Sequence, residues 1–292
     1  MKIAIATDTN SGITAMEGEK LGVFVLAMPV NLEETIHYEG IDITSEQLYD
    51  AMRQHRDVST SQPSPGQLME LWDGILAKGY DEIVYIPMSS GLSGSCQSAA
   101  LFAQDYDGKV QVVDNHRISV TQRESVISAL RLVEQGYDAG QIRDFLEKHA
   151  YDASIYITVD SMEYLKKGGR VTPAAATLAT VLNLKPVLTL QGDKLDAFAK
   201  VRGMKLAESK MIEAIHHDRE ARFKDVPESR LLIETAGTLE NGELAEHWRQ
   251  QVQAEFPFAK VSYANLPCSI ACHVGMNSVA AVIMTEEVQR AD

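Results

Sequence analysis

Apolar and polar positions in the first half of the chain alternate between two periods. Short runs rich in Val, Ile and Leu predict strands at residues 2–8, 22–30, 82–88 and 109–114. Helical spacing between them predicts helices at residues 44–55, 64–79, about 95–104, 120–135 and 139–149. Capping-box patterns, Thr44-x-x-Gln47 and Ser64-Pro65-Gly66-Gln67, begin the first two helices. Strand and helix at this spacing predict an α/β fold with a mainly parallel sheet.

The second half has a different pattern and predicts a second α/β domain. Strands are expected at residues 154–159, 187–190, 194–198 and 230–236, followed by two closing strands, and residues 191–193 would turn a hairpin. Helices are expected at 161–168, 204–223 and 239–255, and an alanine-rich helix would run from Thr172-Pro173 to near residue 183. We place the boundary near residue 153, giving domains 1–153 and 154–292.

Composition narrows the class of protein. The 292 residues are 45% hydrophobic, which can form a core, and 41 acidic against 27 basic side chains give a net charge of −14. That charge argues against nucleic-acid binding and against broad attraction to an anionic membrane. The first eight residues are too polar for a secretory signal, no segment is apolar enough to span a bilayer, and three cysteines do not make a disulfide scaffold. We expect a cytoplasmic protein.

The strongest local feature is the serine- and glycine-rich loop at residues 87–95, where a strand turns into a helix. Small residues and the free amides of a helix start suit an anion, although the loop could simply cap its own helix. Gly91-Leu92-Ser93-Gly94-Ser95 is also close to the nucleophile elbow of a serine hydrolase, with Asp114 and His273 following in order. The second glycine comes one position early, so the hydrolase is the weaker alternative. No dinucleotide or Walker motif is present.

Three other stretches carry polar groups. Residues 58–65 precede a capped helix, and capping leaves Ser59, Thr60 and Ser61 unexplained. Arg170 follows two glycines at the start of the alanine-rich helix, where an anion or plain solvent could face it. Residues 268–273 contain two cysteines and His273 without the spacing of a haem or zinc site, so buried cysteines are the better account.

Together these segments resemble the DegV family of fatty-acid-binding proteins, the acyl-carrying subunits of bacterial fatty acid kinase. The resemblance covers essentially the whole chain. It rests on six segments in order: Asp8-Thr9-Asn10-Ser11, Thr60-Ser61-Gln62-Pro63-Ser64-Pro65, Ser89-Ser90-Gly91-Leu92-Ser93-Gly94-Ser95, Gly168-Gly169-Arg170, Leu184-Lys185-Pro186 and His273-Val274-Gly275. It implies two α/β domains with one long-chain fatty acid in a tunnel between them, and no cofactor.

The resemblance also implies roles for residues of this chain. The hydroxyls of Thr60 and Ser93 would bind the carboxylate, with backbone amides near Ser61 and Gly94. Arg170 and His273 would be cationic or donor groups around the same head group, and the alanine-rich helix would help to enclose the tail. A kinase partner would phosphorylate the bound carboxylate for phospholipid metabolism, so that this chain performs no chemistry alone. The sequence has Met276-Asn277 where the family usually has Pro-Gly.

Loading a lipid requires contact with a membrane, and the basic residues are unevenly distributed. Seven of them fall within forty positions of the second domain, and we expect a local basic rim that allows transient membrane contact. They are Lys166, Lys167, Arg170, Lys194, Lys200, Arg202 and Lys205.

Overall fold

The computed structural model describes residues 1–177 and 184–289, and it divides into two compact units. The first comprises residues 1–151, 267–269 and 287–292, and the second comprises residues 152–266 and 270–286. The division into domains 1–153 and 154–292 stays a prediction.

The first unit is built on a parallel sheet with the strand order β2-β1-β6-β7. This confirms the predicted parallel α/β arrangement. Successive side chains of a strand point to opposite faces, so Ile5 packs in one core layer while Ala4 and Ala6 pack in the other. The strands are β1 (Ile3–Asp8), β2 (Val23–Leu26), β6 (Glu82–Ile86) and β7 (Val110–Val112).

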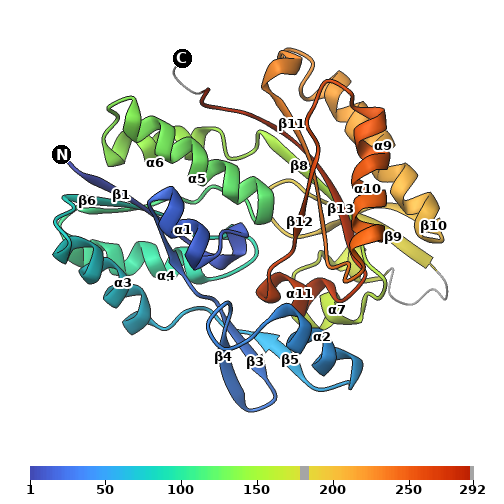
Figure 1. Ribbon diagram of the computed structural model, residues 1–292, viewed down its shortest axis with the longest axis horizontal. Coiled ribbons are helices and arrows are strands. Elements are labelled where there is room, and N and C mark those ends of the chain that lie inside the picture. The colour runs from blue at the N-terminus through green and yellow to red at the C-terminus, as the bar shows by residue number, and fades with distance from the viewer. Residues whose placement is uncertain (178–183, 290–292) are drawn as a thin grey trace. The chain divides into compact units, whose positions relative to one another are not determined.

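Helices cover both faces of this sheet (Figure 1). α5 (Ser119–Glu134) and α6 (Ala139–Lys148) pack on the face that carries Ile5, and α3 (Pro65–Ala77) and α4 (Ser95–Phe102) pack on the other. The capping boxes predicted at Thr44 and Ser64 are confirmed at the starts of α2 (Ser45–Arg53) and α3. Short 3-10 helices follow β1 and α4 at η1 (Thr9–Ser11) and η2 (Ala103–Tyr106).

The single strand predicted at residues 22–30 is wrong. The chain forms β2 and then β3 (Pro29–Leu32), which belong to two different sheets. Pro29 has no amide for a ladder, and the amide of Met28 donates to the Thr9 hydroxyl at 3.1 Å, so the pairing of β2 stops there. The sequence analysis also missed α1 (Ala15–Leu21) and a small antiparallel sheet in which β3 lies between β4 (Thr35–Tyr38) and β5 (Val58–Thr60).

The second unit contains a six-stranded mixed sheet with the order β10-β9-β8-β13-β11-β12. Only the β11–β12 pair is parallel among these described strands, and β9 and β10 form the predicted hairpin. α9 (Met204–Ala221) and α10 (Gly242–Glu255) contribute to its core. The strands are β8 (Ala153–Thr158), β9 (Leu184–Leu190), β10 (Asp196–Arg202), β11 (Leu231–Gly237), β12 (Ser262–Asn265) and β13 (Val279–Thr285).

Short helices of the chain carry the remaining sequence motifs. α7 (Glu163–Gly168) starts after Ser161, whose hydroxyl accepts the Glu163 amide at 3.2 Å, and η4 (Glu228–Arg230) precedes β11. α8 (Pro173–Ala176) is the start of the alanine-rich helix, whose predicted continuation over residues 178–183 lies outside the described residues. α11 (Cys268–Val274) was not predicted, and all three cysteines are buried as expected. Among the helices described, none is long and apolar enough to cross a bilayer.

Candidate functional site

The carboxyl ends of β1 and β6 form the switch point of the parallel sheet. β1 is followed in the chain by β2 on one side of it, whereas β6 lies on its other side. Connections therefore leave these two adjacent strands in opposite directions, which is where open α/β sheets bind ligands. The turn after β1 begins at Asp8, and the serine-rich loop follows β6.

A buried carboxylate connects the two loops. Asp8 is fully buried, and it accepts hydrogen bonds from the amides of Met88 (3.1 Å) and Asn10 (3.0 Å) and from Nε2 of Gln122 (3.1 Å). Burial raises the pKa of Asp8, while the bonds from Met88, Gln122 and Asn10 oppose that rise. Gln122 Nε2 also donates to the carbonyl of Ile86 at 3.1 Å, so α5 is fixed to the ends of both strands.

Two serine hydroxyls of the serine-rich loop accept hydrogen bonds from amides of the same loop. The amide of Gly91 donates to Oγ of Ser89, and the amide of Ser95 donates to Oγ of Ser93, each at 3.2 Å. Ser93 Oγ accepts in this bond, so its proton stays available to donate to a carboxylate. Apart from the Ser95 amide, which Ser93 accepts, the first-turn amides of α4 lack intrahelical partners, and Gly94 at the start of the helix brings no side chain to cap them. The arrangement offers an anion both a hydroxyl and amide donors.

The structure brings the threonine–serine stretch to this loop. Thr60 ends β5 and is half-buried, and Ser61 and Gln62 follow as exposed residues. Oε1 of Gln62 accepts a hydrogen bond from Oγ of Ser98 at 3.3 Å, and it lies 3.4 Å from the position of a Cβ on Gly94. The predicted residues of the first unit thus come from two segments that meet at the first turn of α4.

The predicted residues of the second unit form their own cluster. Gly168 lies against the ring of His273, and Arg170 donates through Nη1 to the carbonyl of Gly168. Burial, with a smaller contribution from the nearby positive charge of Arg170, lowers the pKa of His273 to about 4. His273 is therefore neutral at pH 7. Of the two roles expected for it, cation or donor, only the donor fits this state.

Met276-Asn277 follows His273-Val274-Gly275 in the turn after α11. Asn277 adopts φ 57°, the left-handed region that glycine favours and asparagine tolerates best among other residues. Gly275 has φ 76°, and a Cβ there would lie 2.8 Å from Cδ2 of Tyr164. Asn277, at the position of the family's glycine, thus adopts a backbone conformation that glycine also favours.

A second carboxylate at the switch point, half-buried, was not predicted from the sequence. Glu39 accepts hydrogen bonds from the hydroxyls of Thr9 (2.9 Å) and Ser269 (3.0 Å) and from the amide of Cys268. Burial raises the pKa of Glu39, and these donors oppose the rise. Oγ of Ser269 also donates to Oδ1 of Asn10 at 2.8 Å. Asp8 could have been suspected from sequence, because it ends a buried strand, but Glu39 carries no local signal.

The hydrolase alternative gains no support from these contacts. Within residues 1–177 and 184–289, Oγ of Ser93 bonds the Ser95 amide and no histidine. Asp114 approaches His116 at 3.7 Å and accepts the Ser90 amide at 3.2 Å. In the same ranges, no group of three or more His, Cys, Asp or Glu side chains is arranged to hold a metal ion.

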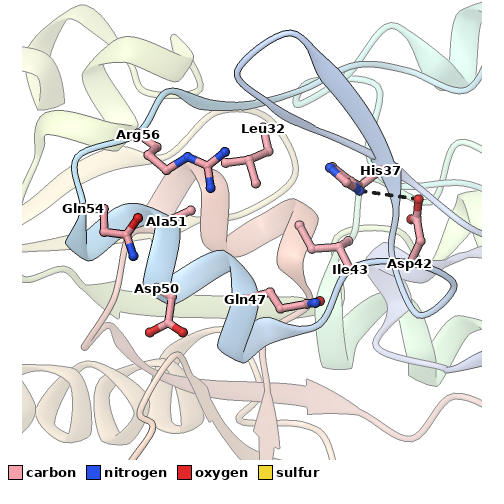
Figure 2. A pocket seen from close by; sticks show the side chains of 9 residues that line it. All are labelled: Leu32, His37, Asp42, Ile43, Gln47, Asp50, Ala51, Gln54 and Arg56. Carbon is pink, nitrogen blue, oxygen red and sulfur yellow. Dashed lines mark ion pairs between the residues drawn. The ribbon is translucent and has the colours of Figure 1, made fainter.

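A cavity of about 260 Å³ lies in the first unit beside α2, and none of the predicted site residues is among its lining residues (Figure 2). His37 and Asp42 form an ion pair at 3.4 Å on one side of it, and Arg56, on the other side, pairs with Glu33 at 2.7 Å. Only three of its nine lining residues are apolar, so its walls do not suit a long acyl tail. The nine lining residues are Leu32, His37, Asp42, Ile43, Gln47, Asp50, Ala51, Gln54 and Arg56.

Comparison with known proteins decides the family. The family model of the DegV proteins matches residues 2–286 of this chain. The chain belongs to the DegV family. A DegV domain-containing protein of Deinococcus radiodurans is 35% identical over 216 residues, which are 74% of this chain and 76% of that protein.

Solved DegV structures share the fold. A DegV family protein from Thermus thermophilus, described for its fatty acid binding, has a TM-score of 0.86 at 30% identity and covers 98% of this chain and 100% of its own. DegV of Bacillus subtilis, described as a fatty acid binding protein, has a TM-score of 0.84 at 25% identity, with coverage of 98% and 99%.

Proposed function

We propose that this DegV protein binds one long-chain fatty acid, with the carboxylate at Thr60 and Ser93 and the acyl tail buried. The observation that supports the proposal is the contact of Gln62, two residues after Thr60, with Ser98 and Gly94 at the first turn of α4, directly after Ser93. Hydroxyls and helix-start amides suit a carboxylate taken out of water. The fatty acid binding described for the Thermus and Bacillus relatives supports the same ligand class.

The energetics allow tight and reversible binding. Burying ~15 methylenes at about 0.8 kcal/mol each contributes on the order of 12 kcal/mol. Lost freedom of the ligand and desolvation of its carboxylate subtract several kcal/mol of that. Ser61, Gly94, Arg170 and His273 complete the set of head-group residues that we propose, with His273 as a neutral donor.

We further propose that the protein presents its ligand to the catalytic subunit of a fatty acid kinase in the cytoplasm. The kinase would transfer the γ-phosphoryl group of ATP to a carboxylate oxygen, giving an acyl phosphate and ADP, and this chain would contribute no catalytic group. The seven clustered basic residues all lie in the second unit, and all but the half-buried Arg170 are exposed. They support transient contact with an anionic membrane during loading.

Equilibrium titration with palmitate and oleate tests the head-group residues. We expect Thr60→Ala with Ser93→Ala to weaken binding by at least about tenfold, because a buried carboxylate loses two hydroxyl donors. Ser64→Ala, which removes a helix cap in the same polar stretch, is the matched control and should leave affinity unchanged. Equal affinity of the double variant and the wild type would remove Thr60 and Ser93 from the site.

A further inference from the structure

Gln62 lies where the two head-group segments of the first unit meet. Its Oε1 accepts a hydrogen bond from Oγ of Ser98 at 3.3 Å. Ser98 is one helical turn after Gly94, because its amide donates to the Gly94 carbonyl at 3.0 Å. The terminal amide of Gln62 is therefore held along the first turn of α4, beside the residue that follows Ser93.

The oxygen and the nitrogen of the Gln62 amide have different hydrogen-bonding roles. Oε1 is the acceptor that Ser98 occupies, so Nε2, on the same carbon, carries two N–H donors next to Gly94. Gly94 leaves this space open, since Oε1 of Gln62 would already touch a Cβ there at 3.4 Å. Gln62 is exposed, so the fold does not require a protein acceptor for these two donors.

We propose that Gln62 is a head-group residue whose Nε2 donates a hydrogen bond to the carboxylate at Ser93. This inference rests on the proposed function and adds, within the first unit, the side-chain donor of Gln62 to those of Thr60 and Ser93. It makes the site selective for a charged acceptor, because an amide N–H bonds a carboxylate more strongly than a neutral hydroxyl. The competing role for Gln62 is purely structural, a tie between the loop and α4.

The variant Gln62→Glu separates the two roles. Glutamate keeps an oxygen to accept from Ser98 but replaces the donor with a negative charge. We expect its dissociation constant for palmitate at pH 7.5 to rise by at least about tenfold, while that for 1-hexadecanol stays within about twofold. A Gln62 that only ties the loop to α4 predicts a smaller loss for palmitate, caused by repulsion from the new charge alone. Gln62→Met, which removes the donor without adding charge, is therefore measured beside it, and a merely structural Gln62 predicts no larger loss for Gln62→Met than for Ser98→Ala. Ser98→Ala, which breaks the tie and keeps the donor, should weaken palmitate binding less than Gln62→Glu.

Each outcome bears on one claim. Wild-type protein that binds no palmitate contradicts the proposed function, whatever the variants do. Wild-type protein that binds palmitate, with Gln62→Glu binding it equally well, overturns the role of Gln62 alone. Should Gln62→Glu fail to fold by circular dichroism, Gln62→Met removes the donor without adding charge. It should lose affinity for palmitate and keep that for 1-hexadecanol, and equal losses for both ligands would contradict the inference.

Discussion

Gly168 packs against the imidazole of His273 so closely that a Cβ on Gly168 would lie 2.3 Å from Nδ1. Two motifs that are about a hundred positions apart in the chain are thus complementary in shape within the second unit. At Gly168 a side chain would have no space. Gly169 adopts φ 68°, and a Cβ added there would have no atom within 4 Å. The contact explains why a glycine precedes Arg170 and where His273 is held.

Gly168→Ala should destabilise the protein because the imidazole must move to admit a methyl group. We expect a loss of about 1–3 kcal/mol in the free energy of unfolding, measured by urea denaturation. Gly74→Ala is the control, since Gly74 lies in the exposed part of α3 with no atom within 4 Å of the added carbon. That change should be neutral or stabilising by up to about 1 kcal/mol. Equal effects of the two variants would contradict the close contact.

The neutral state of His273 predicts a pH dependence of stability. Its pKa of about 4 in the folded protein lies below the ordinary value of 6.5, so between these values the unfolded chain binds a proton that the folded protein does not. Stability should therefore fall as pH falls through this window, with a contribution of up to about 1.4 kcal/mol per pH unit from this group. Urea denaturation of the wild type and His273→Phe across the window measures the difference. Parallel pH profiles would show that His273 titrates normally.

Asp8 should be essential to the architecture of the switch point. Asp8→Ala leaves the amides of Met88 and Asn10 buried without their acceptor, and we expect a loss of about 2–5 kcal/mol in unfolding free energy. Asp81→Ala removes an exposed carboxylate that accepts the Lys2 amide at 2.6 Å in the same unit. This control should cost less than about 1 kcal/mol. The prediction fails if chemical denaturation gives both variants the same stability.

Removing one partner of the buried ion pair between Arg117 and Glu287 should destabilise the first unit strongly. Both side chains are almost fully buried, and Arg117 also donates to the carbonyls of Ala150 (3.1 Å) and His149 (2.6 Å). Glu287→Ala leaves a buried guanidinium without its carboxylate, which should cost about 3–5 kcal/mol.

The exposed pair of Glu246 and Arg249 provides the control for that experiment. Glu246 accepts from Arg249 at 2.7 and 2.8 Å on the surface of α10. Removing it should cost no more than about 1 kcal/mol, because water screens and solvates exposed charges. Melting temperatures of the two variants measured under one set of conditions give the comparison, and a larger loss for Glu246→Ala would contradict the burial argument.

Regular elements with local signals could be predicted from the sequence. Thr44 and Ser64 begin α2 and α3 with complete capping boxes, and the Val- and Ile-rich runs form the parallel sheet, because these signals act within a few residues. The break between β2 and β3 could not be predicted, since it depends on the Thr9 hydroxyl, which is distant in sequence from Met28. α11 was missed because its first amide is capped by Glu39.

The sequence indicates candidate residues for the site, which stay predictions, but it does not indicate the contacts between them. Ser93 follows a strand of a parallel sheet, and that position alone indicates a ligand site. The role of Gln62 depends on a contact with Ser98, more than thirty residues later, and the neutrality of His273 depends on burial. Contacts between distant segments and the desolvation of a side chain leave no mark in a single sequence.

Native mass spectrometry of the purified protein tests the central claim most directly. We predict that the protein carries, or takes up from added palmitate or oleate, one fatty acid per chain, and that organic extraction releases the same acid. A protein that retains its fold but shows no bound fatty acid and takes up neither ligand would contradict the account.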